Sequence, residues 1–438
     1  MARATMFFPP DFRWGTATAA YQVEGANVNS DWWVWEQGNG RILQNHKSAL
    51  ACNWWEDAEK DLDAAAAMGT NAHRLSLEWS RIEPEPSVFD EAALGRYRQI
   101  LQAMWDRGIE PMVTLHHFSN PLWLVEKGDF NRSIVVDYFQ RYTAKVVAGL
   151  GDLVPKWVTI NEPMVYVFMR YLDGKFPAPS RRGWPGAREA AGNLLRCHAA
   201  AYHTIKDLLP AAEVGVAKHT AVFQPQTDNK LAHWWTRRVD WLFNEMWLAS
   251  MVNGRLHWPL GRGKIKNLAG SFDFVGVNYY TRHYVKFPPL GGLLANEWGA
   301  QATVSDGNYG EVYPEGLYQS IQRMLKYQKP IYITENGLPD VADRLRPSFL
   351  MTHLREIWRA ISFCFPVMGY YHWSLVDNFE WDRGWTQRFG LIGLNPETQE
   401  RQWRASGELY SEICHTRSLS SEMAERYAPE LLATMFPG

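Results

Sequence analysis

Short apolar runs alternate with longer helical patterns along the whole chain, and this alternation limits the possible folds more than any other feature. The runs have the length of buried strands, and residues 74–79 also alternate polar and apolar side chains with the period of two typical of strands. The predicted strands lie within residues 12–18, 74–79, 111–116, 157–160, 214–217, 272–277, 331–334 and 367–373. The predicted helices between them cover residues 55–68, 91–107, 133–150, 187–209, 234–250, 316–327 and 347–362. Regular alternation implies a parallel sheet, and eight units predict an α/β fold, a closed (β/α)8 TIM barrel.

No feature of the sequence marks a second domain, so residues 1–438 are expected to form one catalytic barrel domain. There is no low-complexity linker, and the Gly- and Pro-rich stretch 283–315 is expected to be a long loop over the sixth unit. In the tail 416–438, Met423, Tyr427 and Leu431 are spaced like one face of a helix. We therefore predict a helical tail packed on the barrel, with an oligomer contact as the alternative.

The composition argues against several kinds of partner and compartment. Lys and Arg number 45 against 47 Asp and Glu, which makes nucleic acid and anionic membranes poor partners. No apolar run is long enough to span a membrane, and the first residues do not resemble a signal peptide. The four cysteines form no C-x-x-C pair, so we expect free thiols and a cytoplasmic location. The 22 Trp residues indicate a large core, and they also modestly favour a carbohydrate ligand.

Polar residues follow several of the predicted strands, at the end of the barrel where active sites form. The segment WVTINEP (157–163) places Glu162 after the fourth strand, and IYITENG (331–337) places Glu335 after the seventh. Each has a structural alternative, because Glu162 could begin a helix marked by Pro163 and Glu335 could be a solvated residue beside a turn. Together the two carboxylates match glycoside hydrolysis, which requires one protonated and one ionised carboxyl group.

Eight motifs in order make the chain resemble glycoside hydrolase family 1 from about residue 7 to residue 405. They are GTATAAYQVEG (15–25), HRLSLEWSRI (73–82), VTLHHF (113–118), TINEP (159–163), DFVGVNYYT (273–281), YPEGL (313–317), YITENG (332–337) and WSLVDNFEW (373–381). The resemblance implies a retaining β-glycosidase that releases terminal β-linked sugars through a covalent glycosyl-enzyme, a β-glucosidase with β-galactosidase and β-fucosidase activity as further options. It implies a small β-glycoside or oligosaccharide as partner, with no cofactor.

The resemblance also assigns roles to individual residues. Glu162 would be the acid/base and Glu335 the nucleophile. Arg74 and Tyr280 would hold Glu335 ionised, and Asn161 and Asn278 would support the pair. Glu162 would have to stay protonated in the free enzyme, helped by the charge of Glu335 and by partial burial. The sugar would be bound by Gln22, His117, Trp373, Glu380 and Trp381.

The chain departs from the family pattern mainly on the side of the leaving group. Phe118 replaces the usual Trp near the sugar, Met164 stands where a Trp is common, and Gly310, preceded by Tyr309, stands where an aromatic residue is expected. The segment between about 250 and 272 is short for the family. We therefore expect an open aglycone side with few stacking rings.

Other functions remain as alternatives. A 6-phospho-β-glycosidase is disfavoured because Glu380, Gln387 and Phe389 differ from that branch and a carboxylate would repel phosphate. A non-catalytic sugar-binding relative is disfavoured because both carboxylates are present, whereas transglycosylation stays open. His116 and His117 lack a third ligand at a metal-site spacing, so no metal is expected. The oligomeric state does not follow from the sequence.

Overall fold

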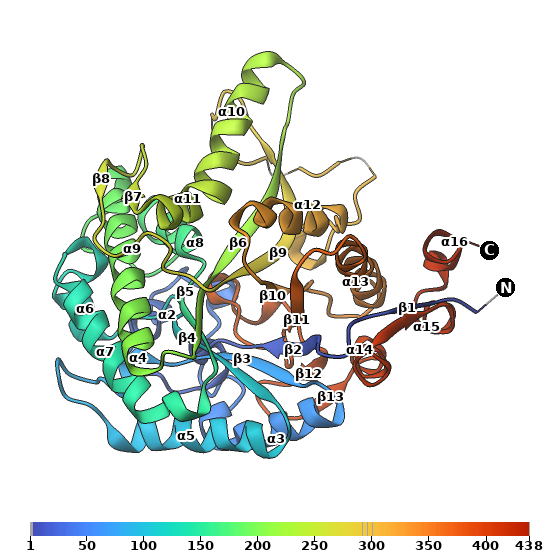
Figure 1. The fold of residues 1–438 in the computed structure, drawn as a ribbon, viewed down its shortest axis with the longest axis horizontal. Helices are drawn as coiled ribbons and strands as arrows, with labels where there is room; N and C mark the ends of the chain where they lie inside the picture. The colour runs from blue at the N-terminus through green and yellow to red at the C-terminus, as the bar shows by residue number, and fades with distance from the viewer. Residues whose placement is uncertain (1–2, 291, 296, 300, 438) are drawn as a thin grey trace.

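The computed structural model describes residues 3–290, 292–295, 297–299 and 301–437. Eight parallel strands close into a barrel in the order β10-β11-β2-β3-β4-β5-β6-β9. They are β2 (Arg13–Ala17), β3 (Ala72–Ser76), β4 (Glu110–His116), β5 (Lys156–Asn161), β6 (Glu213–Pro225), β9 (Phe274–Val285), β10 (Ile331–Asn336) and β11 (Val367–Trp373). The predicted (β/α)8 barrel is confirmed (Figure 1).

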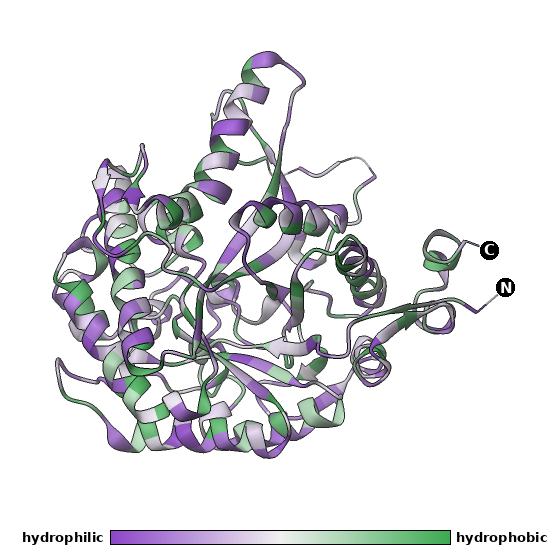
Figure 2. Cartoon of the chain, in the orientation of Figure 1, coloured by the Kyte–Doolittle hydropathy of each residue, from purple (hydrophilic) through white to green (hydrophobic). Residues whose placement is uncertain are grey.

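Helices surround the barrel and cover the outer face of its strands. The principal ones are α3 (Trp54–Ala67), α5 (Glu91–Asp106), α7 (Val135–Leu150), α9 (Gly183–Leu208), α10 (Lys230–Asp240), α11 (Met246–Asn253), α12 (Glu315–Met324) and α13 (Arg346–Ser362). In α5, the buried residues Leu94, Tyr97, Leu101 and Met104 recur every three or four positions, so one face packs inward. Figure 2 shows the same mixture of hydrophobic and hydrophilic residues along the surrounding helices. The strands, enclosed on both sides, are almost wholly buried.

Two strands are much longer than the sequence predicted. The apolar run 214–217 marks only the start of β6, which continues to Pro225, and β9 continues to Val285. Beyond the barrel the two strands stay paired, from Val222 opposite Arg282 to Pro225 opposite Val285. Together with α10 they form the lobe that projects at the top of Figure 1. The predicted helix 234–250 is divided by a π-helical turn, η5 (Trp241–Glu245), between α10 and α11.

The C-terminal tail, expected to be helical and packed on the barrel, consists of a short strand and short helical segments. After α14 (Ala405–Thr416), the short strand β14 (Ser418–Ser420) pairs antiparallel with β1 (Thr5–Phe7). Helix α15 (Ser421–Tyr427) and the single turn α16 (Leu432–Met435) follow, and their buried residues Met423 and Met435 join the core. A three-residue strand lacks a readable periodicity, which explains why β14 was missed. Gly438, the last residue of the predicted tail, lies outside the described residues.

A buried ionic cluster supports the wall of the barrel mouth. The Arg170 guanidinium contacts Asp31 Oδ2 at 2.7 Å and Asp129 Oδ2 at 3.1 Å. Asn120 Nδ2 donates to Asp31 at 2.8 Å and to the hydroxyl of Tyr166 at 3.0 Å. The Tyr166 ring in turn stacks on Phe118, with centroids 6.2 Å apart. The cluster therefore supports a residue of the barrel mouth from behind.

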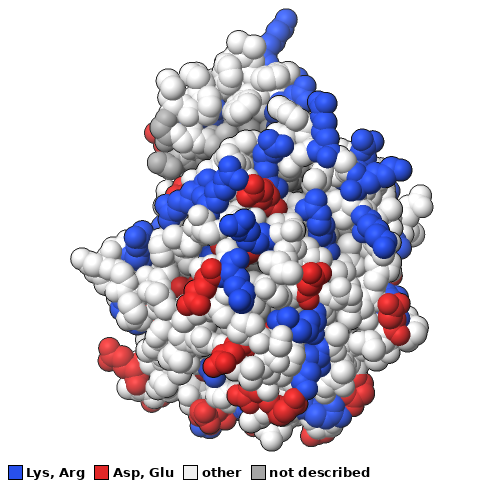
Figure 3. All heavy atoms as spheres, turned by 90° about the vertical axis from the view of Figure 1, so that its left-hand side faces the viewer, with Lys and Arg blue, Asp and Glu red and all other residues white. Residues whose placement is uncertain are grey.

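The surface carries charges of both signs. Figure 3 shows basic and acidic side chains interspersed on one face, and uncharged atoms over much of the projecting lobe. Within the described part of the chain, no helix has both the length and the apolar character needed to cross a membrane.

Candidate active site

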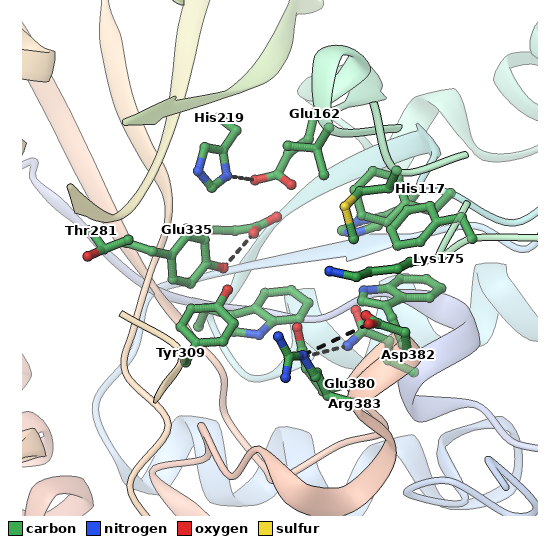
Figure 4. Close-up of a pocket in the computed structure, with 18 of the residues that line it drawn as sticks. His117, Glu162, Lys175, His219, Thr281, Tyr309, Glu335, Glu380, Asp382 and Arg383 are labelled. Carbon is green, nitrogen blue, oxygen red and sulfur yellow. Dashed lines mark hydrogen bonds and ion pairs between the residues drawn. The ribbon is translucent and has the colours of Figure 1, made fainter. Parts of the chain in front are cut away.

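A pocket of about 270 Å³ opens at the C-terminal ends of the barrel strands (Figure 4). Most of the residues predicted from the sequence line it, namely Gln22, His117, Glu162, Tyr280, Tyr309, Glu335, Trp373, Glu380 and Trp381. Arg74, Asn161 and Asn278 are buried next to the two carboxylates and contact them or one another. Met164 and Gly310 are not in the lining of this pocket.

Glu162 directly follows β5 and takes the N-cap position of the short helix α8 (Pro163–Val167). Its backbone has a φ of 43°, in the left-handed region that costs energy for a residue with a side chain. The carboxylate makes no capping bond. Instead, Oε1 lies 2.8 Å from His219 Nδ1 and accepts a hydrogen bond from Asn278 Nδ2 at 2.9 Å. The expectation that Glu162 begins a helix is correct for its backbone, whereas its side chain turns into the pocket.

Glu335 lies inside β10 and is only 3% exposed, so it is not a solvated turn residue. Arg74 Nη1 donates to Oε1 at 2.6 Å, and the Tyr280 hydroxyl donates to Oε2 at 2.7 Å. Both oxygens are therefore held by donors that come from different strands. Figure 4 shows the side chains of Glu162 and Glu335 facing the same space from opposite sides.

Two amides connect the two carboxylates. Asn161 Oδ1 accepts from Arg74 Nη2 at 2.6 Å and from Asn278 Nδ2 at 3.1 Å. Thr334 Oγ1 donates to Asn278 Oδ1 at 2.6 Å, which fixes that amide with its Nδ2 toward Glu162. A side-chain network that spans four strands thus sets the relative placement of Glu162 and Glu335.

Burial and neighbouring charges shift the pKa values of both carboxyl groups. Burial raises the pKa of Glu335 to about 7, and the Arg74 cation opposes that rise. Burial also acts to raise the pKa of Glu162, but a positive charge on His219 and the donated hydrogen bonds outweigh it and lower the pKa. The expectation that burial and the charge of Glu335 help to keep Glu162 protonated did not include the contact with His219, which acts in the opposite direction.

The remaining predicted sugar-binding residues form one wall of the pocket. Gln22 Nε2 donates to Glu380 Oε2 at 3.0 Å, and burial raises the pKa of Glu380 to about 8. The His117 ring stacks against both Trp373 and Trp381, with centroids 6.0 and 5.9 Å away. Within the described residues, Gln22 Oε1 and His117 Nδ1 are buried without a hydrogen-bond partner. This wall therefore offers an acceptor and a ring nitrogen at the edge of flat aromatic surfaces.

The departures on the leaving-group side take a different form from the one predicted. A Cβ on Gly310 would lie 2.8 Å from Thr281 Cβ, so this position is closely packed and leaves no space for an aromatic side chain. Tyr309 lines the pocket instead and contacts Phe389 edge-on at 5.2 Å. Met164 lines a neighbouring cavity rich in aromatic rings, to which residues 258–260 also contribute. The expectation of an open side with few rings is therefore wrong, because rings from other segments gather there.

Several pocket residues carry no sequence motif that would reveal them. His219 lies on the unpredicted extension of β6, and its ring stacks on Tyr280 with centroids 5.8 Å apart. Lys175, Asp382 and Arg383 reach the pocket from outside the barrel strands (Figure 4). Asp382 and Arg383 come directly after the last predicted motif in the sequence, and this nearness is the signal that could have revealed them. No such signal points to Lys175.

The paired histidines do not gather metal ligands. His116 Nε2 contacts Asn120 Oδ1 at 3.1 Å, and His117 Nε2 contacts Asn161 Nδ2 at 3.0 Å. Across the residues that the structure describes, no three His, Cys, Asp or Glu side chains come close enough to hold a metal ion.

Comparison with known proteins accounts for this arrangement of carboxylates. A family model described as Glycosyl hydrolase family 1 matches residues 4–419. The chain belongs to glycosyl hydrolase family 1. The resemblance inferred from its eight motifs is confirmed.

Relatives in this family include both glucosidases and galactosidases. Beta-glucosidase A of Thermotoga maritima is 30% identical over 445 residues, which cover 94% of this chain and 98% of the relative. A beta-galactosidase of Saccharolobus solfataricus is 31% identical, with 95% of this chain and 96% of the relative covered. The solved structure of a beta-glycosidase from Pyrococcus horikoshii is 36% identical and has a TM-score of 0.89, covering 97% of this chain and 98% of that one. This family 1 protein is therefore an enzyme, a retaining β-glycosidase.

Proposed function

We propose that Glu335 is the nucleophile and Glu162 the acid/base of this β-glycosidase. The observation that carries the proposal is the difference between their partners. Glu335 receives one strong donor on each oxygen, which suits a carboxylate that must be ionised to attack. Glu162 has an imidazole nitrogen as its neighbour, which suits a group that must release and recover a proton.

The proposed reaction proceeds by two displacements. In the first, a Glu335 oxygen bonds to the anomeric carbon while the bond to the leaving oxygen breaks and Glu162 passes its proton to that oxygen. In the second, Glu162 takes a proton from water, the water oxygen attacks the anomeric carbon, and the bond to Glu335 breaks. Arg74 and Tyr280 stay in contact with Glu335 throughout. They stabilise its negative charge when the bond to the sugar breaks and the carboxylate forms again.

His219 decides how Glu162 can carry the proton. A positively charged ring lowers the pKa of Glu162 and favours its ionised form. A neutral ring with a free Nδ1 lone pair accepts a hydrogen bond from protonated Glu162, and burial then acts to raise the pKa. The contact with His219 therefore bears directly on the protonation of Glu162.

The glycone is proposed to lie against the wall formed by Gln22, His117, Glu380 and the two indoles of Trp373 and Trp381. Sugar hydroxyls would satisfy Gln22 Oε1 and His117 Nδ1, two buried atoms of this wall that have no hydrogen-bond partner among the described residues. Glucose and galactose are the proposed glycones because the relatives are named for them. The carboxyl group of Glu380 supports an unmodified sugar over a 6-phosphorylated one. Partition of the glycosyl-enzyme toward sugar acceptors remains the alternative outcome of the same chemistry.

Two variants test the assignment. Glu335→Gly should lose nearly all turnover on every β-glycoside. Glu162→Ala should retain glycosylation of aryl glycosides whose leaving group needs no proton, and lose it for alkyl glycosides. Equal losses on both classes of substrate would contradict the role of Glu162.

Two further proposals concern the chain as a whole. Residues 1–438 are proposed to act as one domain, since the N-terminal strand β1 and the tail strand β14 pair with each other beside the barrel. A reducing compartment such as the cytoplasm is proposed because Cys52, Cys197, Cys364 and Cys414 are all free thiols, and three of them are buried. Limited proteolysis would test the single domain, which should resist cleavage into separate parts. Thiol labelling of protein isolated from cells would test the compartment, since all four cysteines should be found reduced.

A further inference from the structure

A cavity of about 420 Å³ lies between the segments that follow strands β2 and β3, away from the active-site pocket. Its volume is within the range of sites that enclose small organic ligands. None of its described lining residues also lines the active-site pocket. Its wall is formed by the loop 26–29, the first turns of α3 and α5, and the segment 80–84, which includes the end of α4 (Trp79–Ile82). We name it the α5 cavity.

The charges around the α5 cavity cancel. Among the described residues of its lining, the ionisable ones are Arg81, Arg96, Glu56 and Asp90. Carboxylates in the wall would repel an anion and guanidinium groups would repel a cation, so the cavity favours a ligand without net charge. Both arginines already have carboxylate partners. Arg81 Nε donates to Glu24 Oε2 at 2.9 Å, and Arg96 donates to Glu59 at 2.6 Å.

The lining combines hydrogen-bonding groups with carbon surface. The uncharged hydrogen-bonding side chains are those of Asn27, Asn29 and Ser80. The carbon surface comes from Val28, Trp55, Pro84, Ala92 and Ala93. A pyranose presents the same combination, since its hydroxyl groups surround a ring of carbon atoms. A purely hydrocarbon ligand would leave the polar groups of the wall without partners, which costs free energy.

One buried polar atom of this wall lacks a partner. Asn27 is 3% exposed, and its Oδ1 accepts no hydrogen bond from the described residues. A buried acceptor without a donor costs free energy, and native proteins leave few of them. Because Asn27 also lines the α5 cavity, a hydroxyl group bound there would supply the missing donor.

Contacts within the protein hold the wall in place. The Arg81 guanidinium lies over the Trp55 ring, 4.1 Å from its centroid. Arg96 Nε donates to the carbonyl oxygen of Trp55 at 2.7 Å. Asn29 Nδ2 donates to the carbonyl oxygen of Pro84 at 3.0 Å. Side chains that are already fixed lose little entropy when a ligand binds, so the α5 cavity is preorganised.

We infer that the α5 cavity is a second sugar-binding site, separate from the catalytic pocket, and that it takes a neutral pyranose such as glucose. The choice of glucose rests on the proposed function, which makes it a sugar that the enzyme releases. Arg81 of the wall holds Glu24, which stands two positions after Gln22 of the glycone wall. Sugar in the α5 cavity is therefore one ion pair away from the segment that carries a glycone-binding residue.

The test is a calorimetric titration with glucose, after one equivalent of a tight-binding iminosugar has filled the catalytic pocket. The unaltered enzyme should still bind glucose with saturable heat. Ala92→Phe should abolish that heat, because Ala92 is an exposed residue of the wall and a ring there would occupy the cavity. Ala405→Phe is the matched control and should retain the heat, since Ala405 is exposed at the start of α14 and does not line the cavity.

A second variant tests the unpaired amide. Asn27→Leu keeps the size of the side chain and removes its Oδ1. The Kd for glucose should rise by about two- to twelvefold, the effect of losing one hydrogen bond to an uncharged ligand. An unchanged Kd would contradict the contact assigned to Asn27.

The outcomes separate this inference from the proposed function. Absence of saturable heat in the unaltered enzyme, or heat that Ala92→Phe retains, would overturn the second sugar site. Saturable heat with inorganic phosphate and none with glucose would identify an anion site and would equally overturn it. Release of glucose from an aryl β-glucoside by the same preparation tests the proposed function on its own, because that reaction takes place in the catalytic pocket.

Discussion

Removal of the Tyr280 hydroxyl is the most informative single change at this site. Tyr280→Phe keeps the ring that stacks on His219 and deletes the O–H that donates to Glu335 Oε2 at 2.7 Å. Burial keeps the pKa of Tyr280 well above its usual range, so the hydroxyl is a donor throughout the working pH range. The substitution therefore removes one hydrogen bond to a carboxylate and little else.

The magnitude follows from the strength of that bond. A hydrogen bond to a charged group contributes about 1.5–3 kcal/mol, and this one lowers the pKa of Glu335 from the value that burial alone would give. Without it the pKa rises above about 7, so at pH 6 the ionised fraction of Glu335 falls by about 10- to 150-fold. At higher pH the carboxylate is ionised in both proteins, and the loss should shrink.

The assay is kcat/KM for an aryl β-glucoside across the pH range, read as macroscopic values of the carboxyl pair. Tyr280→Phe should move the acid limb of the profile to higher pH. Tyr327→Phe is the matched control, because it removes a tyrosine bond to the carboxylate of Glu245, 3.1 Å long and outside the pocket. A loss of the same size at every pH would refute the reasoning, since it would mean that the hydroxyl acts on something other than ionisation.

Three further predictions use other parts of the structure. His219→Asn removes the ring whose contact lowers the pKa of Glu162, so that pKa should rise and the alkaline limb of kcat/KM should move up; a limb that stays in place would contradict the assigned contact. Arg170→Met leaves two buried aspartates without their cation and should lower the free energy of unfolding by about 3–5 kcal/mol in a urea titration, whereas Arg98→Met, at an exposed pair, should change it little. A retaining enzyme holds its two carboxyl groups about 5–5.5 Å apart and gives a product of unchanged configuration. Early proton NMR spectra of hydrolysis should therefore show the β-anomer first, and an α-anomer as the first product would exclude the double displacement.

The sequence predicted those parts of the site that lie at the ends of regular strands. Glu162 and Glu335 follow short apolar runs, and the barrel rule alone brings such positions to one face. His219 could not be predicted in this way, because β6 loses its apolar pattern where it leaves the barrel and its half-buried residues look like a loop. Trp184, Trp235 and Trp258 are far apart in the chain and line one cavity only through the fold, so no local pattern predicts the aromatic cavity beside the active-site pocket. The close packing at Gly310 likewise comes from Thr281, which belongs to another segment of the chain, so the sequence around Gly310 could not reveal it.

The paired extensions of β6 and β9 also set the distance between the acid/base and the neighbouring aromatic cavity. His219, next to the acid/base, and Phe223, in the neighbouring aromatic cavity, stand on one strand four residues apart, which is about 13 Å at strand spacing. The partner strand covers the same stretch with an interval of five residues, from Asn278, opposite His219, to His283, opposite Phe223, because the register shifts between Thr220 and Val222. The extra residue in β9 shows that the two strands do not match residue for residue, and because pairing resumes beyond it, the paired backbone still sets the distance between the acid/base and the aromatic wall.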